Sequence, residues 1–169
     1  MKLTHTKLAL AVLFAALVMT SLGASAQIWS AAAATCAVDE DSLTHYVFKD
    51  AGQFTVPSGY YGESTVRCGV VNPLDSGNPG WGRLYLGFYD PGSGASATAT
   101  LYEVSRTPSL TGFRRRTIAA VTSLDIGYGF NYTPFSYGFN FSQYVYFVQV
   151  VLDNPNNSPP AAFYVTLEP

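Results

Sequence analysis

The chain has 169 residues, including 9 Lys or Arg and 11 Asp or Glu. This length is typical of a single domain, and the net charge of −2 excludes a general nucleic-acid binder, which needs a basic surface. Because 15% of the residues are aromatic and 48% are hydrophobic, the composition also excludes a disordered acidic tail and supplies a sizeable core.

Residues 1–26 have the three parts of a secretory signal peptide. Two lysines lie within the first seven residues, the apolar run Leu8–Met19 follows, and Ala-Ser-Ala at 24–26 has the small residues of a cleavage site. As a helix this run would span about 18 Å, too short for a hydrocarbon core of about 30 Å. The sequence therefore predicts a secreted or cell-surface protein, cleaved near Ala26, with no membrane span.

Cys36 and Cys68 are the two cysteines of the chain. In an exported protein an even pair is most simply one disulfide. A metal site would need more ligands than two thiols and His45, which is the one histidine after the signal peptide. A disulfide between Cys36 and Cys68 is therefore predicted.

Residues 27–43 contain four consecutive alanines and precede the first strong strand pattern. They are predicted to form an N-terminal extension that carries Cys36, ahead of a single domain over residues 44–169. Most such segments are flexible. A sharper alternative is that residues 27–35 add as a strand to a neighbouring subunit's sheet, which is a route to filaments.

From residue 44 onward, short runs of aromatic and β-branched residues alternate with turn residues. This pattern predicts an all-β fold, an antiparallel β-sandwich of about eight strands with jelly-roll or Ig-like topology and one disulfide. The segment 142–152 is apolar on both sides, which fits either a central strand or a strand whose outer face meets a partner. The strands are expected near residues 44–49, 52–56, 63–71, 82–89, 97–105, 114–121, 142–152 and 161–167.

Residues 128–141 are dense in aromatics and contain Tyr-Gly-Phe-Asn followed by an aromatic residue twice. Such a segment can stack on sugar rings or on a neighbouring subunit, and its composition is also that of segments prone to assembly. Alternatively, it is a loop folded over one end of the sandwich, with its aromatics closing the core. The candidate contact residues are Trp81, Tyr132, Phe135, Tyr137, Phe139, Tyr144 and Tyr146.

Residues that could perform acid–base or metal chemistry are scarce. His45 has no second imidazole beside it, and the sequence contains neither a nucleophile elbow nor a phosphate loop, so no catalytic residue is assigned. Residues 39–41 and 153–158 offer oxygens to Ca²⁺, but they match no EF-hand spacing and are better explained as solvated turns, so no cofactor is expected. The basic cluster Arg114–Arg116 is expected to protect an edge strand, with binding to acidic polymers as the alternative.

Three short motifs mark the layout of the chain: Cys36 soon after the signal peptide, the segment Val66–Val70 around Cys68, and Leu84–Gly92, in which Tyr-Asp precedes a Gly-rich turn. This layout resembles a loose group of bacterial secreted β-sandwich proteins with one disulfide, although Gly69 stands where that group has proline. No activity is attached to the group. The resemblance implies the fold and export, and it adds no site.

These observations predict a secreted, non-enzymatic protein that acts by surface contact. The leading hypothesis is a subunit or adhesive component of an extracellular assembly or filament, with itself or other extracellular proteins as partners. The alternative is a carbohydrate-binding module that holds a polysaccharide on an aromatic platform. A more remote alternative is a secreted glycan hydrolase, which would need a facing pair of carboxylates.

Overall fold

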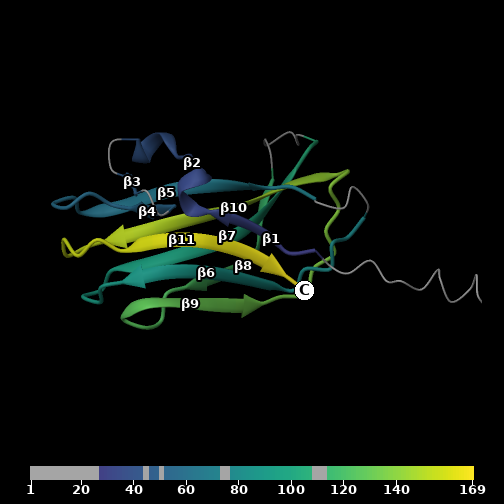
Figure 1. Ribbon diagram of the computed structural model, residues 1–169. Helices are drawn as coiled ribbons and strands as arrows, with labels where there is room; N and C mark the ends of the chain where they lie inside the picture. Colours follow the sequence, from purple (N-terminus) through teal and green to yellow (C-terminus); the bar gives the residue numbers. More distant parts are fainter. Residues whose placement is uncertain (1–26, 44–45, 50–51, 73–76, 108–113) are drawn as a thin grey trace, which may run out of the picture.

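The chain folds into two antiparallel β-sheets that pack face to face (Figure 1), which confirms the predicted β-sandwich. The predicted signal peptide and His45 lie outside the residues that this computed structural model describes. The described residues are 27–43, 46–49, 52–72, 77–107 and 114–169.

The six-stranded sheet has the order β3-β4-β11-β6-β9, and β1 also pairs with β11. The five-stranded sheet has the order β2-β5-β10-β7-β8. The strands of the first sheet are β1 (Trp29–Ala32), β3 (Val47–Lys49), β4 (Gln53–Thr55), β6 (Arg83–Asp90), β9 (Gly127–Pro134) and β11 (Ala161–Glu168). Those of the second are β2 (Ala37–Val38), β5 (Gly62–Val70), β7 (Ser96–Ser105), β8 (Arg115–Thr122) and β10 (Tyr144–Asn154).

Each expected strand corresponds to an observed one, but β1, β2 and β9 were not expected. Residues 27–43 are therefore not an extension ahead of the folded body, because β1 pairs with β11 from Trp29 to Ala32 and β2 pairs with β5. The helices in the described part of the chain are the 3-10 turns η1 (Ala33–Thr35) and η2 (Glu40–Ser42). Neither approaches the length or the apolar character that crossing a membrane requires.

Alternate residues along the strands fill the space between the sheets. Leu84 and Leu86 of β6 and Val165 of β11 are completely buried, and so are Val148 and Val150 of β10. β10 lies between β5 and β7, so the segment that is apolar on both sides is a central strand. The remaining alternate positions of the strands face outward from the two sheets.

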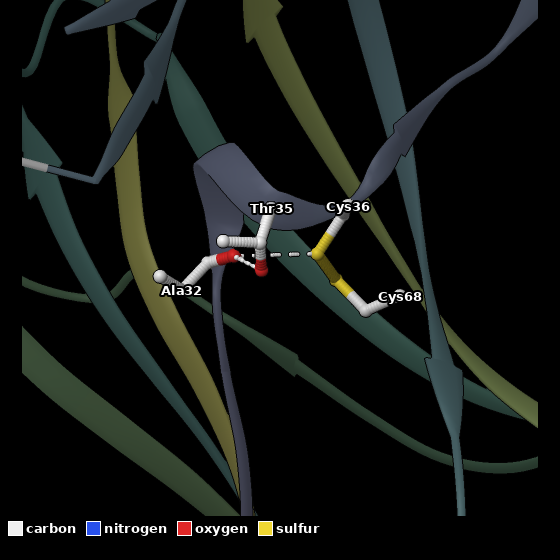
Figure 2. The surroundings of a disulfide bond; sticks show 4 residues. All are labelled: Ala32, Thr35, Cys36 and Cys68. Atoms are coloured by element: carbon white, nitrogen blue, oxygen red, sulfur yellow. Dashed lines mark hydrogen bonds between the residues drawn. A yellow bond between two sulfur atoms is a disulfide. The ribbon is translucent and has the colours of Figure 1, made fainter.

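The disulfide joins Cys36 to Cys68, as predicted. Cys36 follows η1, where the chain passes from β1 in one sheet to β2 in the other, and Cys68 lies within β5. Figure 2 shows the same turn held by Thr35, whose Oγ1 donates a hydrogen bond of 2.8 Å to the carbonyl oxygen of Ala32. The disulfide therefore fastens the N-terminal segment to the centre of the sandwich.

Replacing both cysteines, in the variant C36A/C68A, is expected to lower the free energy of unfolding by about 3–4 kcal/mol. The physical reason is that the disulfide restricts the unfolded chain by closing a loop across a sequence separation of 32 residues. Urea denaturation of the variant and of the reduced wild-type protein checks this, and the two should agree. An unchanged midpoint in both samples would show that the disulfide contributes nothing to stability.

Candidate functional site

The outer face of the six-stranded sheet carries a continuous group of aromatic side chains on β6, β9 and β11. Tyr128, Phe130 and Tyr132 of β9 are 79%, 66% and 48% exposed, and Tyr164 of β11 is 42% exposed. Large exposed apolar patches are uncommon on soluble monomers and mark binding sites. We call this group the aromatic platform: Tyr85, Tyr89, Tyr128, Phe130, Tyr132, Phe163 and Tyr164.

The strand register brings the members of the aromatic platform together. Tyr132 lies opposite Tyr85 and Tyr128 opposite Tyr89, so the rings of β9 and β6 meet in pairs on one face. The Tyr85 and Tyr132 rings are stacked, with centroids 5.1 Å apart, and those of Tyr89 and Tyr128 are 4.7 Å apart. Phe163 extends the group, because its ring lies 5.8 Å from that of Tyr128.

β9 presents its aromatics outward because its other face is tied to the neighbouring strand of the opposite sheet. Asn131 Nδ2 donates a hydrogen bond of 2.8 Å to the carbonyl oxygen of Thr122, and Thr133 Oγ1 donates one of 2.7 Å to that of Ala120. Both acceptors belong to β8. These bonds close one side of the sandwich and set which residues of β9 face the solvent.

Gly87 lets the ring of Tyr164 lie against the sheet. A Cβ atom at Gly87 would come within 2.3 Å of a ring carbon of Tyr164 and within 2.8 Å of two more, so the ring occupies that space. Gly87 lies between Tyr164 and Phe130 in the register of β11, β6 and β9. Because Gly87 has no side chain, the ring of Tyr164 can lie close to the backbone of the sheet in the middle of the aromatic platform.

A cavity of about 540 Å³ adjoins one end of the aromatic platform. Tyr89 and Tyr128 belong to both, and none of the described residues that line the cavity is charged. The site therefore combines an open aromatic face with a neutral pocket. The lining residues are Gln53, Thr55, Val56, Pro57, Ser58, Tyr89, Tyr128 and Pro159.

The outer face of the five-stranded sheet differs from the aromatic platform. It carries one stacked pair, Tyr102 and Phe147, with ring centroids 5.2 Å apart, and the guanidinium of Arg115 lies 4.5 Å from the Tyr102 ring. Around this pair the outward positions include Arg67, which forms an ion pair with Asp39 at 2.6 Å. Aromatic residues are thus concentrated on one face of the sandwich.

The predicted contact residues do not form one exposed surface. Of the seven candidates, Trp81, Phe139 and Tyr146 are buried in the core, so for these three the expectation of a contact surface is corrected. Tyr132 is an exposed member of the aromatic platform. The remaining candidates, Phe135, Tyr137 and Tyr144, are partly buried and pack against the core.

Phe139 is the centre of this end of the core. Its ring lies 5.1 Å from those of Trp81 and Tyr137 and 5.0 Å from that of Tyr146. Tyr146 also accepts a hydrogen bond of 2.8 Å from the backbone N–H of Asn140. Residues 135–143 therefore close one end of the sandwich, which is the alternative in which their aromatic side chains complete the core.

Tyr137 is fixed there by a buried carboxylate. Its hydroxyl donates a hydrogen bond to Glu103, which also forms an ion pair of 2.9 Å with Arg116. Partial burial raises the pKa of the Tyr137 phenol, and the hydrogen bond to Glu103 raises that pKa further. Tyr137 therefore stays neutral and serves as a structural hydrogen-bond donor.

Arg115 and Arg116 point to opposite faces of β8, which is an edge strand of its sheet.

No group of three or more His, Cys, Asp or Glu residues within the described ranges is placed to hold a metal ion. The second cavity, of about 500 Å³, lies beside residues 139–142. Among the residues that the structure describes, those that line this cavity and the pocket beside the aromatic platform include no carboxylate.

The fold is similar to that of solved carbohydrate-binding modules. No protein-family model and no curated protein matches the sequence. A xylan-binding module of family 86 from Roseburia intestinalis has a TM-score of 0.51 and 13% identity, over 84% of this chain and 95% of that one. A family 11 module from Clostridium thermocellum, solved with a mixed-linked β-1,3-1,4 tetrasaccharide, has a TM-score of 0.44 and 14% identity, over 86% and 91% of the two chains. At 13% and 14% identity, these similarities concern the fold alone. The TM-score of 0.44 is too low to support any further argument.

The prediction of an adhesive or filament subunit is wrong. It depended on residues 128–141 as an aromatic contact segment that includes Phe139, and its sharper form had residues 27–35 add as a strand to a neighbouring subunit's sheet. The structure buries Phe139 and pairs β1 within its own sheet. In addition, the similar solved structure with a TM-score of 0.51 is described as a xylan-binding module.

Proposed function

We propose that this protein is a non-catalytic carbohydrate-binding module that holds a polysaccharide on the aromatic platform. The observation that carries the proposal is the set of exposed rings at Tyr128, Phe130, Tyr132 and Tyr164 on one sheet face. A pyranose ring has a face of C–H groups and a rim of hydroxyls. Stacking that face on an aromatic ring removes apolar surface from water and leaves the hydroxyls solvated.

The chemistry of the aromatic platform fits a neutral ligand. Its side chains are Tyr and Phe, and beyond Tyr85 the register pairs two residues of opposite charge, Arg83 and Glu168. The tyrosine hydroxyls add hydrogen-bonding groups beside the rings. Neutral polysaccharides are therefore favoured over acidic ones.

The predicted signal peptide and the Cys36–Cys68 disulfide support a site of action outside the cell. Polysaccharides of cell walls and secreted matrices are present there. Export and the aromatic platform thus point to the same class of ligand. The proposed partner is a polysaccharide surface or chain.

The direct test is depletion of the purified secreted protein from solution by a panel of insoluble polysaccharides, including cellulose, xylan, mannan, chitin and starch. Binding to at least one neutral polymer is expected, and free sugar chains from the same polymer should release it. Tryptophan fluorescence is a poor readout, because Trp29 and Trp81 are 7% and 2% exposed. No depletion by any polymer of the panel would refute the proposal.

Gly87→Ala is expected to weaken binding to the selected polysaccharide by about three- to tenfold. The added Cβ would meet the ring of Tyr164 and lift it from the sheet, so the rings would no longer present a low surface. Gly69→Ala is the matched control, because a Cβ at Gly69, on the outer face of β5, has no other atom within 4 Å. Equal affinities for the two variants would show that Tyr164 does not contribute.

A further inference from the structure

The pocket beside the aromatic platform has its own structural origin. In the register of the six-stranded sheet, Ala161 lies between Thr55 on one side and Tyr89 on the other, with Tyr128 next to Tyr89. The small side chain of Ala161 thus lies between the larger side chains of Thr55 and Tyr89 on the same face. This difference in size leaves the pocket beside Tyr89 and Tyr128.

Two loops stand at the pocket, where β4 ends and β11 begins. Pro57 and Ser58 come from the loop after β4, and Pro159 comes from the loop before β11. The loops are joined, because the backbone N–H of Gly59 donates to Asn157 Oδ1 at 2.6 Å and Asn154 Nδ2 donates to the carbonyl oxygen of Tyr60 at 2.6 Å. These hydrogen bonds set the shape of the pocket before a ligand arrives.

The pocket also differs chemically from the aromatic platform. Gln53 brings an amide and Ser58 a hydroxyl, and Thr55 Oγ1 is held by a hydrogen bond of 2.8 Å to the carbonyl oxygen of Pro160. Amides and hydroxyls donate to and accept from sugar hydroxyls without requiring a charge. The aromatic platform provides stacking, and the pocket provides hydrogen bonds that depend on the position of each hydroxyl.

We propose that this pocket binds the terminal sugar of a neutral polysaccharide chain. The inference rests on the proposed function and names the part of the ligand that the site selects. A chain that follows β9 from Tyr132 over Phe130 reaches Tyr128 at the end of the sheet where the two loops stand. Its last ring then lies between Tyr89 and the polar groups of Gln53 and Ser58.

The test compares a binding polysaccharide before and after limited cleavage by an endo-acting hydrolase, which raises the number of chain ends at constant mass. The amount of wild-type protein bound at saturation is expected to rise in proportion to the ends. The variant Q53A/S58A is expected to bind cleaved polymer about tenfold more weakly than wild type, through lost hydrogen bonds. Gln143→Ala, at an exposed position away from the pocket, is the matched control and should behave as wild type.

The outcomes separate the two proposals. Capacity that is independent of chain ends, with binding still present, overturns the pocket assignment and leaves the platform function standing. Capacity that follows the density of side branches instead of ends also overturns it, and assigns the pocket to a branch sugar. Absence of binding to every polymer overturns the proposed function itself.

The folding of Q53A/S58A is checked by its urea midpoint. If the double variant is unstable, Ser58→Ala alone, at an exposed turn, replaces it in the test.

Discussion

Replacing Tyr128, Phe130 and Tyr132 together with alanine is expected to weaken polysaccharide binding by about 100-fold, because each aromatic stack contributes about 1 kcal/mol beyond the area it buries. These are the most exposed rings of the aromatic platform. Their removal leaves the backbone pairing of β9 with β6 in place. The measurement is the dissociation constant for the polymer selected by the panel.

The control for this variant is a change on the other face of the sandwich. Tyr102 and Phe147 form the stacked pair on the five-stranded sheet, so Y102A/F147A removes two rings that the aromatic platform does not include. Its affinity should match that of the wild type. If instead Y102A/F147A abolishes binding and the triple variant retains it, the binding face has been assigned to the wrong sheet.

Phe139→Ala is expected to lower the free energy of unfolding by about 3–5 kcal/mol, which is the range for removing a buried phenylalanine. Its ring is 4% exposed and meets Trp81, Tyr137 and Tyr146. Truncation leaves a cavity at the end of the core. Chemical denaturation monitored by circular dichroism provides the measurement.

Phe130→Ala is the matched comparison, since Phe130 occupies the same position in the other copy of Tyr-Gly-Phe-Asn and is 66% exposed. It should change stability by less than about 1 kcal/mol while it weakens polysaccharide binding. The two variants thus separate folding from function. A larger loss of stability from Phe130→Ala than from Phe139→Ala would contradict the division into core and platform.

The two copies of Tyr-Gly-Phe-Asn have different structures, which the sequence alone could not predict. Locally they are the same, yet Tyr128–Asn131 lies in an edge strand and Tyr137–Asn140 closes the core. The difference arises from long-range contacts, because Asn131 bonds to β8 whereas Phe139 meets Trp81. Because the two local sequences are the same, they do not indicate which copy contacts β8 and which contacts Trp81.

The strands with clear alternation of aliphatic residues were predictable, and so was the disulfide. β9 was not, because its glycines and Asn131 are poor strand formers, so the residue types of this segment do not indicate a strand. Its aromatics at alternate positions, Tyr128, Phe130 and Tyr132, were a usable signal of period two. The aromatic platform itself also required the order β11-β6-β9, which places rings from distant parts of the chain side by side.

The most direct test of the central claim is to map the binding surface by amide chemical-shift perturbation, using isotope-labelled protein and a soluble oligosaccharide of the selected polymer. The largest shifts are expected in β6, β9 and the part of β11 around Tyr164, with Gln53 and Ser58 also affected. Shifts confined to the five-stranded sheet, around Tyr102 and Phe147, would contradict the claim that the aromatic platform is the binding site.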